Sequence, residues 1–220
     1  MRWCVQADET PLFGRERGCD EFEQEVLRFD GPSGVRAHEE DDEMLYVLHG
    51  SGIAEVGGER VELARGAALF VRHGTTWQVA EAGGLEILSV LVRDPLPEDS
   101  THAVVAVDDA ETGEATAGRQ FRLLAPTVTA TQFLGYIPVG RAPDHFHKYD
   151  EVVYVLDGEG AMHIGGETAP LRPGSCVHLP AGLVHCLENT GPEEMHVLGV
   201  FRPAGSPAEA YYPDGTKAVY

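Results

Sequence analysis

Short runs of β-branched, aromatic and aliphatic residues, each ended by glycine, recur along the chain. The runs MLYVLHG at 44–50 and VVYVLDG at 152–158 are both followed by segments that end in Gly-Gly, at 57–58 and 165–166. A Gly-Gly pair between two such runs is typical of a two-residue β-hairpin turn, and helical periodicity is scarce. The pattern therefore predicts an all-β protein of short antiparallel strands, arranged as a sandwich or a barrel.

The same strand pattern occurs twice. Residues 42–77 align without a gap on residues 150–185, with 13 identities in 36 positions and an offset of 108. Because the offset is about half of the 220-residue chain, it indicates a duplicated domain and not a solenoid, which needs at least about three short repeats. We therefore expect two tandem barrels, at residues 1–98 and 99–220. We expect the last residues, from about 204 onward, to form an extended and loosely ordered arm.

The charge of the chain narrows the choice of partners. The sequence has 36 acidic and 16 basic residues, which gives a formal net charge of -20. Such a chain repels phosphate backbones and anionic membrane surfaces, so we expect no nucleic acid and no membrane as partner. No apolar run approaches the roughly 18 residues of a membrane span, and the start lacks the apolar segment of a secretion signal. These features predict a cytoplasmic protein; a homodimer is allowed by the sequence but not decided by it.

The cysteines give little information about structure. Cys4, Cys19, Cys176 and Cys186 form no Cys-x-x-Cys pair, and four cysteines in a chain of this length are not a disulfide scaffold. We interpret them as reduced thiols. A disulfide between Cys176 and Cys186 across neighbouring strands stays open.

The second repeat carries residue types that bind metals. His145 and His147 are two positions apart, so on a strand they share one face. Glu151 follows four residues later, and His185 comes just after a Pro-Ala-Gly turn. Three imidazoles and one carboxylate suit a divalent first-row transition metal. Such a set would leave two positions of an octahedral ion open to a small oxygenated molecule.

These residues also stand in a pattern that resembles the cupin superfamily, which consists of small antiparallel jelly-roll β-barrels. The first cupin motif is matched by Gly140, His145, His147, Glu151 and Gly158, with one residue fewer than usual after Gly140. The second is matched at every position by Gly174, Pro180, Gly182, His185 and Asn189. The resemblance covers about residues 30–92 and 120–202, so the chain resembles a bicupin of two tandem jelly-roll barrels (double-stranded β-helices). It implies that His145, His147, Glu151 and His185 bind one divalent metal: Fe, Mn, Ni, Co or Zn.

The first repeat departs from this pattern. It keeps Glu43, but Ala37 and Glu39 stand at two histidine positions and Trp77 at the third. A Trp cannot ligate a metal, because its indole N–H is only a donor. We expect this barrel to have lost its metal and to serve structure or dimerisation, with Trp77 plugging the site or lining an apolar ligand pocket. A weakly held ion at His38 and Glu43 stays open.

The resemblance implies a function in small-molecule chemistry, although the fold does not settle which. We favour a metal-dependent, dioxygenase-like oxidoreductase that acts on a small oxygenated organic molecule, with Glu151 doubling as a catalytic proton shuttle. The alternatives are a metal-dependent isomerase or cyclase of secondary metabolism and a non-catalytic small-molecule binding protein. An acid or base inside the barrel would favour catalysis over binding, and the candidates are His163, His178 and Glu188.

Overall fold

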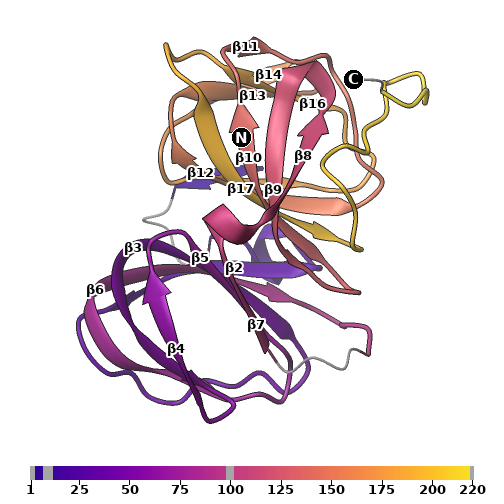
Figure 1. Cartoon of the computed structure of the whole chain (residues 1–220). Coiled ribbons are helices and arrows are strands. Elements are labelled where there is room, and N and C mark those ends of the chain that lie inside the picture. The colour runs from indigo at the N-terminus through magenta and orange to yellow at the C-terminus, as the bar shows by residue number, and fades with distance from the viewer. Residues whose placement is uncertain (1–2, 7–11, 98–101, 219–220) are drawn as a thin grey trace. The chain divides into compact units, whose positions relative to one another are not determined.

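The computed structural model describes residues 3–6, 12–97 and 102–218 (Figure 1). The chain divides into two compact units. The N-terminal unit consists of Thr10–Ala110 with Thr127–Thr129, and the C-terminal unit of Met1–Glu9, Glu111–Pro126 and Ala130–Tyr220. The expected boundary between residues 98 and 99 lies outside the described residues.

The N-terminal unit is built around one antiparallel sheet. Its strands are β2 (Phe22–Phe29), β3 (Asp42–Val56), β4 (Glu59–Ala64), β5 (Ala67–Val71), β6 (Trp77–Val92) and β7 (His102–Ala106). The sheet has the order β2-β6-β3-β5-β7, and β4 pairs with β3. The pairing of the long strands β3 and β6 contains register shifts, which bend and twist strands locally. The buried apolar core of the unit lies on these strands.

The C-terminal unit contains two antiparallel sheets. Its strands are β1 (Cys4–Gln6), β8 (Glu111–Ala115), β9 (Arg119–Pro126), β10 (Thr131–Ile137), β11 (Gly140–Arg141), β12 (Asp150–Asp157), β13 (Gly160–Ile164), β14 (Glu167–Leu171), β15 (Ser175–Leu179), β16 (His185–Asn189) and β17 (Met195–Arg202). One sheet has the order β1-β15-β12-β17-β10-β9-β8, and the other β11-β16-β13-β14. Strand β1 therefore belongs to this unit, although it begins the chain.

Helical structure in the described part of the chain is confined to three short 3-10 turns. They are η1 (Arg15–Arg17), η2 (Val107–Asp109) and η3 (Thr116–Gly118). Among the described residues, no helix has the length and apolar character to cross a membrane.

The duplication in the sequence is visible in the strands. β3 corresponds to β12 and β13, β4 to β14, β5 to β15, and β6 to β16 and β17. Two turn glycines explain part of the repeated pattern. Gly50 and Gly158 have φ angles of 76° and 85°, which favour glycine. A Cβ atom at Gly50 would lie 2.2 Å from the Gly84 carbonyl oxygen, and a Cβ atom at Gly158 would lie 2.8 Å from Met195 Cα.

The alternation along β12 positions the candidate chemistry of the C-terminal unit. Val153 and Val155 belong to the apolar core of this unit, together with Val177 of β15. Because alternate residues of a strand share a face, Glu151 lies on the same side of β12 as these two valines. Its side chain therefore faces the interior of the barrel, where it is 6% exposed.

Candidate functional site

The predicted histidines meet at one end of the C-terminal barrel. His145 and His185 form an isolated antiparallel bridge, with the His145 amide donating to the His185 carbonyl at 3.0 Å and the reverse bond at 2.8 Å. The Gly182 amide donates to the His147 carbonyl at 2.8 Å. All three imidazoles are buried. One ring nitrogen of each histidine lies within 4.8 Å of the corresponding nitrogens of the other two, so the three together could hold a metal ion.

Hydrogen bonds to backbone carbonyls fix which ring nitrogen is available. His145 Nδ1 donates to the Pro143 carbonyl at 2.8 Å, and His185 Nδ1 to the Leu183 carbonyl at 2.8 Å. His147 Nδ1 donates to the Glu209 carbonyl at 2.7 Å. A carbonyl only accepts, so Nδ1 carries the proton, and Nε2 of each neutral ring keeps its lone pair for a ligand. This is the arrangement that orients metal-binding histidines.

Burial keeps these rings neutral. Desolvation lowers the pKa of His145, lowers the pKa of His147 to about 4, and holds the pKa of His185 well below its ordinary value. The positive charge of Arg119 acts in the same direction on all three pKa values. Near pH 7 each imidazole is therefore a neutral donor that needs no deprotonation before it binds a metal.

Glu151 lines the same pocket as the histidines but is not part of their close group. Its carboxylate forms no hydrogen bond or ion pair with any residue in the described part of the chain. Desolvation raises the pKa of Glu151 to about 8, against a smaller opposing effect of Arg119. A buried carboxyl group in this situation carries a proton near neutral pH unless a cation replaces it.

The four side chains lie in one pocket with a mostly apolar wall. The cavity enclosed by these side chains has a volume of about 70 Å³. Apolar side chains from several strands contribute to the wall, among them Phe133, Val153, Met162 and Leu187. An apolar wall with a few convergent polar groups is typical of small-molecule sites.

Arg119, at the start of β9, is a pocket residue that the sequence analysis missed. It lines the pocket, and its Nη2 donates to the Leu187 carbonyl at 2.6 Å. Desolvation lowers the pKa of Arg119, and Coulombic interactions with Cys186 and Glu151 act against this shift. No described carboxylate lies within 4 Å of its guanidinium. Arg119 lies outside both motifs, on a strand that pairs with β10 and β8, so the sequence around it gives no sign that it lines the site.

The other predicted acid–base candidates lie elsewhere in the C-terminal unit. His163 Nε2 lies 2.7 Å from Glu188 Oε2, and its Nδ1 lies 3.0 Å from Thr168 Oγ1. His178 is buried, and its Nε2 lies 3.4 Å from Asp150 Oδ1. None of these three candidates lines the pocket that contains the three ligand-type histidines and Glu151.

Asn189, at the last position of the second motif, has a structural role. Its side-chain amide donates to the carbonyls of Ile137 and Glu193, both at 2.8 Å, and its Oδ1 accepts from the Gly191 amide at 2.9 Å. These bonds hold the turn after β16.

The corresponding position of the N-terminal unit is filled by protein groups. Trp77 is 1% exposed, and its indole Nε1 donates to Glu43 Oε2 at 2.6 Å. Ser89 Oγ donates to Glu43 Oε1 at 2.6 Å, and His38 Nε2 lies 3.6 Å from Glu43 Oε2. Both carboxylate oxygens of Glu43 are thus used in hydrogen bonds, and Trp77 packs within the apolar core of the unit. This is the plug that the sequence favoured over an apolar ligand pocket.

None of the four cysteines takes part in a disulfide within the described residues. Cys19, Cys176 and Cys186 are buried, and Cys4 is partly buried. Cys186 Sγ donates to the Ala142 carbonyl at 2.9 Å and accepts from Arg141 Nε at 3.3 Å. The disulfide between Cys176 and Cys186 that the sequence left open is absent.

Comparison with known families decides the relationship. The cupin domain family matches residues 30–92 and 133–201, which is more than half of the chain. The chain belongs to the cupin family. The predicted all-β fold of two tandem cupin jelly-roll barrels is confirmed.

Solved cupin structures share the fold over nearly the whole chain. Oxalate decarboxylase from Bacillus subtilis superposes with a TM-score of 0.75 at 14% identity, covering 93% of this chain and 78% of that one. Protein Ylba from E. coli superposes with a TM-score of 0.74 at 13% identity, covering 90% of this chain and 89% of that one. At these identities the likeness concerns the fold alone.

Characterised relatives match shorter segments. Polyketide synthase CurC of Streptomyces cyaneus is 36% identical over 101 residues, which are 43% of this chain and 66% of the relative. The oxalate-binding protein of Thermotoga maritima is 35% identical over 57 residues, covering 24% and 47%. Quercetin 2,3-dioxygenase of Bacillus subtilis is 35% identical over 80 residues, covering 32% and 24%. The chain therefore spans between about a quarter and two thirds of the length of these relatives.

Proposed function

We propose that the C-terminal barrel binds one divalent transition metal through His145, His147, Glu151 and His185, and that the protein is a metal-dependent cupin enzyme. The observation that carries this proposal is the convergence of three neutral imidazoles with their Nδ1 positions already occupied. The N-terminal barrel, in which Glu43 is used by Trp77 and Ser89, has no such group of donors among its described residues.

The donor set fits a metal ion. Three nitrogen lone pairs face a shared space, and a buried carboxyl group without a hydrogen-bond partner lines the same pocket. Imidazole and carboxylate donors suit Fe, Mn, Ni, Co or Zn. When bound, such an ion would supply Lewis acidity and a template for substrate oxygens. Glu151 takes part as ligand and, as a buried carboxyl group that lines the same pocket, also as proton shuttle.

Arg119 defines the charge that the pocket favours in a substrate. Its guanidinium lies in a mostly apolar pocket without a carboxylate partner among the described residues. A half-buried cation gains most from an anion that is brought into the same desolvated space. We therefore propose a small oxygenated anion, such as a carboxylate or the enolate of a hydroxy-ketone, as the substrate class. The oxalate-binding protein and oxalate decarboxylase named above are compatible with this class.

The reaction type is the finer part of the proposal. A dioxygenase-like oxidation is our first choice, supported by the match to quercetin 2,3-dioxygenase. An isomerase or cyclase of secondary metabolism is the second choice, supported by the match to polyketide synthase CurC. A non-catalytic binding protein is the third, supported by the match to the oxalate-binding protein. A cytoplasmic location, the lack of nucleic-acid and membrane partners, and the homodimer stay predictions from the sequence.

Metal analysis by plasma mass spectrometry tests the metal site. The protein is purified without chelator and without a nickel column, beside His185→Ala and a control, His163→Ala, which replaces a histidine outside the pocket. We expect about one equivalent of a first-row metal in the wild type and the control, and loss of it in His185→Ala. Equal metal content in all three proteins would refute the assignment.

Ligand titration tests the substrate class. Oxalate, a chelating dianion, and 1,2-propanediol, a neutral chelator, are added to the cobalt-loaded protein, and the visible absorption is followed. Arg119→Met should weaken oxalate binding by roughly 10- to 100-fold, without changing the response to the diol. Arg122→Met, on the same strand but outside the pocket, is the matched control. Unchanged oxalate binding in Arg119→Met would refute the anionic substrate class while leaving the metal site intact.

A further inference from the structure

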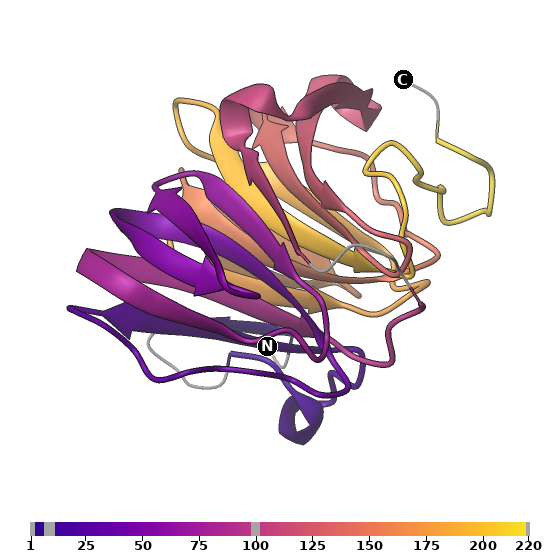
Figure 2. The same cartoon turned by 60° about the horizontal axis from the view of Figure 1, so that its bottom comes forward.

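The C-terminal segment is folded against the barrel. Residues 203–218, which we call the strap, run along the C-terminal unit as the yellow segment of Figures 1 and 2. The Phe146 amide donates to the Tyr211 carbonyl at 2.8 Å, and the reverse bond measures 2.9 Å. The Ala218 amide donates to the Ala210 carbonyl at 2.8 Å, and both alanines are buried. The prediction of a loosely ordered arm is therefore wrong for these residues.

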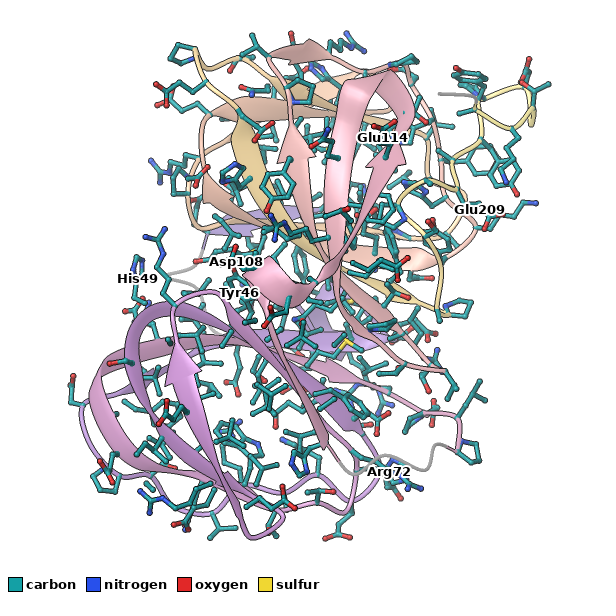
Figure 3. The ribbon with its side chains drawn as sticks, viewed as in Figure 1. Tyr46, His49, Arg72, Asp108, Glu114 and Glu209 are labelled. Atoms are coloured by element: carbon teal, nitrogen blue, oxygen red, sulfur yellow. The ribbon has the colours of Figure 1, made fainter. Side chains whose placement is uncertain are left out.

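The strap reaches the candidate metal site itself. Pro207 and Ala210 line the pocket. Glu209, which Figure 3 places on this segment, supplies the carbonyl that accepts the proton of His147 Nδ1 at 2.7 Å. Part of the pocket lining and the hydrogen-bond partner of His147 Nδ1 thus come from residues 203–218.

The three histidines differ in where their carbonyl partners come from. For His145 and His185 the partner lies two residues earlier in the same segment. For His147 the partner is 62 residues away in the sequence. The orientation of His145 and His185 is therefore local, whereas the orientation of His147 depends on docking of the strap.

Tyr149 joins the strap to His147. Its ring is nearly parallel to the imidazole of His147, with an interplanar angle of 13° and centroids 5.1 Å apart. Its hydroxyl lies within hydrogen-bond distance of the Ser206 carbonyl and of the Glu209 carbonyl, the latter at 3.0 Å. One hydroxyl proton is shared between the two acceptors. Tyr149 therefore holds the same carbonyl that orients His147.

Gly205 allows the strap to pass close to this ring. A Cβ atom at Gly205 would lie 2.4 Å from Tyr149 Cε1 and 2.7 Å from Cδ1. Its φ angle is not among the left-handed values, so the requirement for glycine comes from the contact and not from the backbone. An alanine at this position would force the strap and the Tyr149 ring apart, and the three atoms nearest to its Cβ all belong to Tyr149.

We propose that strap docking and metal binding are coupled, with Tyr149 and the Glu209 carbonyl acting as positioning groups for His147. This inference rests on the proposed metal site and adds its dependence on residues 203–218. A docked strap fixes the Nδ1–H form of His147, which leaves Nε2 for the metal. Coupling between two binding events is reciprocal, so metal binding in turn stabilises the docked strap.

The test uses the full chain and three variants. Gly205→Ala displaces the strap, and Tyr149→Phe removes the shared hydroxyl but keeps the ring. Gly34→Ala is the matched control, because a Cβ there meets nothing within 4 Å. Three quantities are measured: the Kd for Co²⁺ from its visible absorption, hydrogen exchange of residues 203–218 with and without Zn²⁺, and the ring-nitrogen NMR shifts of His147 in the metal-free protein.

We expect the Kd for Co²⁺ to rise by about 10-fold or more in Gly205→Ala and by roughly 2- to 10-fold in Tyr149→Phe, with no change in Gly34→Ala. The wild type should show Nδ1 protonated on His147 and slower exchange of the strap when Zn²⁺ is bound. The coupling would be overturned, with the metal site intact, by a wild-type Kd for Co²⁺ in both Gly205→Ala and Tyr149→Phe. It would also be overturned if the hydrogen-exchange rates of the strap were the same with and without Zn²⁺. A wild-type protein that binds no metal would overturn the proposed function itself, and the coupling with it.

Discussion

Replacing Glu151 by glutamine should change how the metal-free C-terminal unit responds to pH. Burial raises the pKa of Glu151 from an ordinary 4.5 to about 8. Between these two values the folded state holds one proton more than the unfolded state, so stability is greatest at low pH and is lost as the pH rises towards 8. Each pKa unit corresponds to about 1.4 kcal/mol, so the whole shift corresponds to about 5 kcal/mol.

Much of this pH dependence of the free energy of unfolding can be measured between pH 6 and pH 9. Over that range the wild type should lose about 3 kcal/mol of unfolding free energy relative to Glu151→Gln, because the dependence on pH levels off only above pH 8. Both proteins are unfolded in urea in the presence of a chelator, and unfolding of the C-terminal unit is followed by the NMR amide signals of its own strands, such as β12. Identical pH profiles for the two proteins would refute the reasoning that Glu151 is buried without a compensating partner.

Three further predictions concern other parts of the chain. Gly50→Ala and Gly158→Ala should each destabilise their own unit by roughly 1–3 kcal/mol, since φ is positive and space is lacking; urea unfolding measures this, and wild-type midpoints would contradict it. Ser89→Ala should cost the N-terminal unit about 1–3 kcal/mol, because a buried oxygen of Glu43 loses its donor; an unchanged transition would show that Glu43 does not need it. In the metal-free protein, burial lowers the pKa of His147 to about 4, so its ring stays neutral at pH 5. The free energy of unfolding should therefore fall as the pH drops from about 6.5 to 4. An NMR titration in which the His147 imidazole gains its proton near pH 6.5 would contradict this.

The fold could be predicted from the sequence because several of its turns can be formed only by glycine. Glycines such as Gly50 and Gly158 recur at one offset, and each stands where a side chain would meet the backbone of a neighbouring strand. The runs between them alternate faces, as Val153 and Val155 do within the barrel core. Such local requirements leave a direct trace in a single sequence.

Only those site residues that lie close together in the sequence, or at the fixed spacing of a motif, could be predicted. The two motifs predicted the meeting of His145, His147 and His185. Arg119 enters the pocket from β9, and the Glu209 carbonyl reaches His147 from the far end of the chain. The carbonyl contact involves a backbone atom, so no side-chain type marks it. The strap lacks a strand pattern, and its order comes from contacts such as those of Tyr149 and Tyr211.

X-ray absorption of the protein loaded with one equivalent of Co²⁺ tests the central claim most directly. The multiple-scattering signal of imidazole counts histidine ligands around the ion. We predict three imidazoles and at least one oxygen donor in the wild type, with one imidazole fewer in His185→Ala and no change in His163→Ala. An imidazole count that does not fall in His185→Ala would show that the ion binds elsewhere and would contradict the assignment.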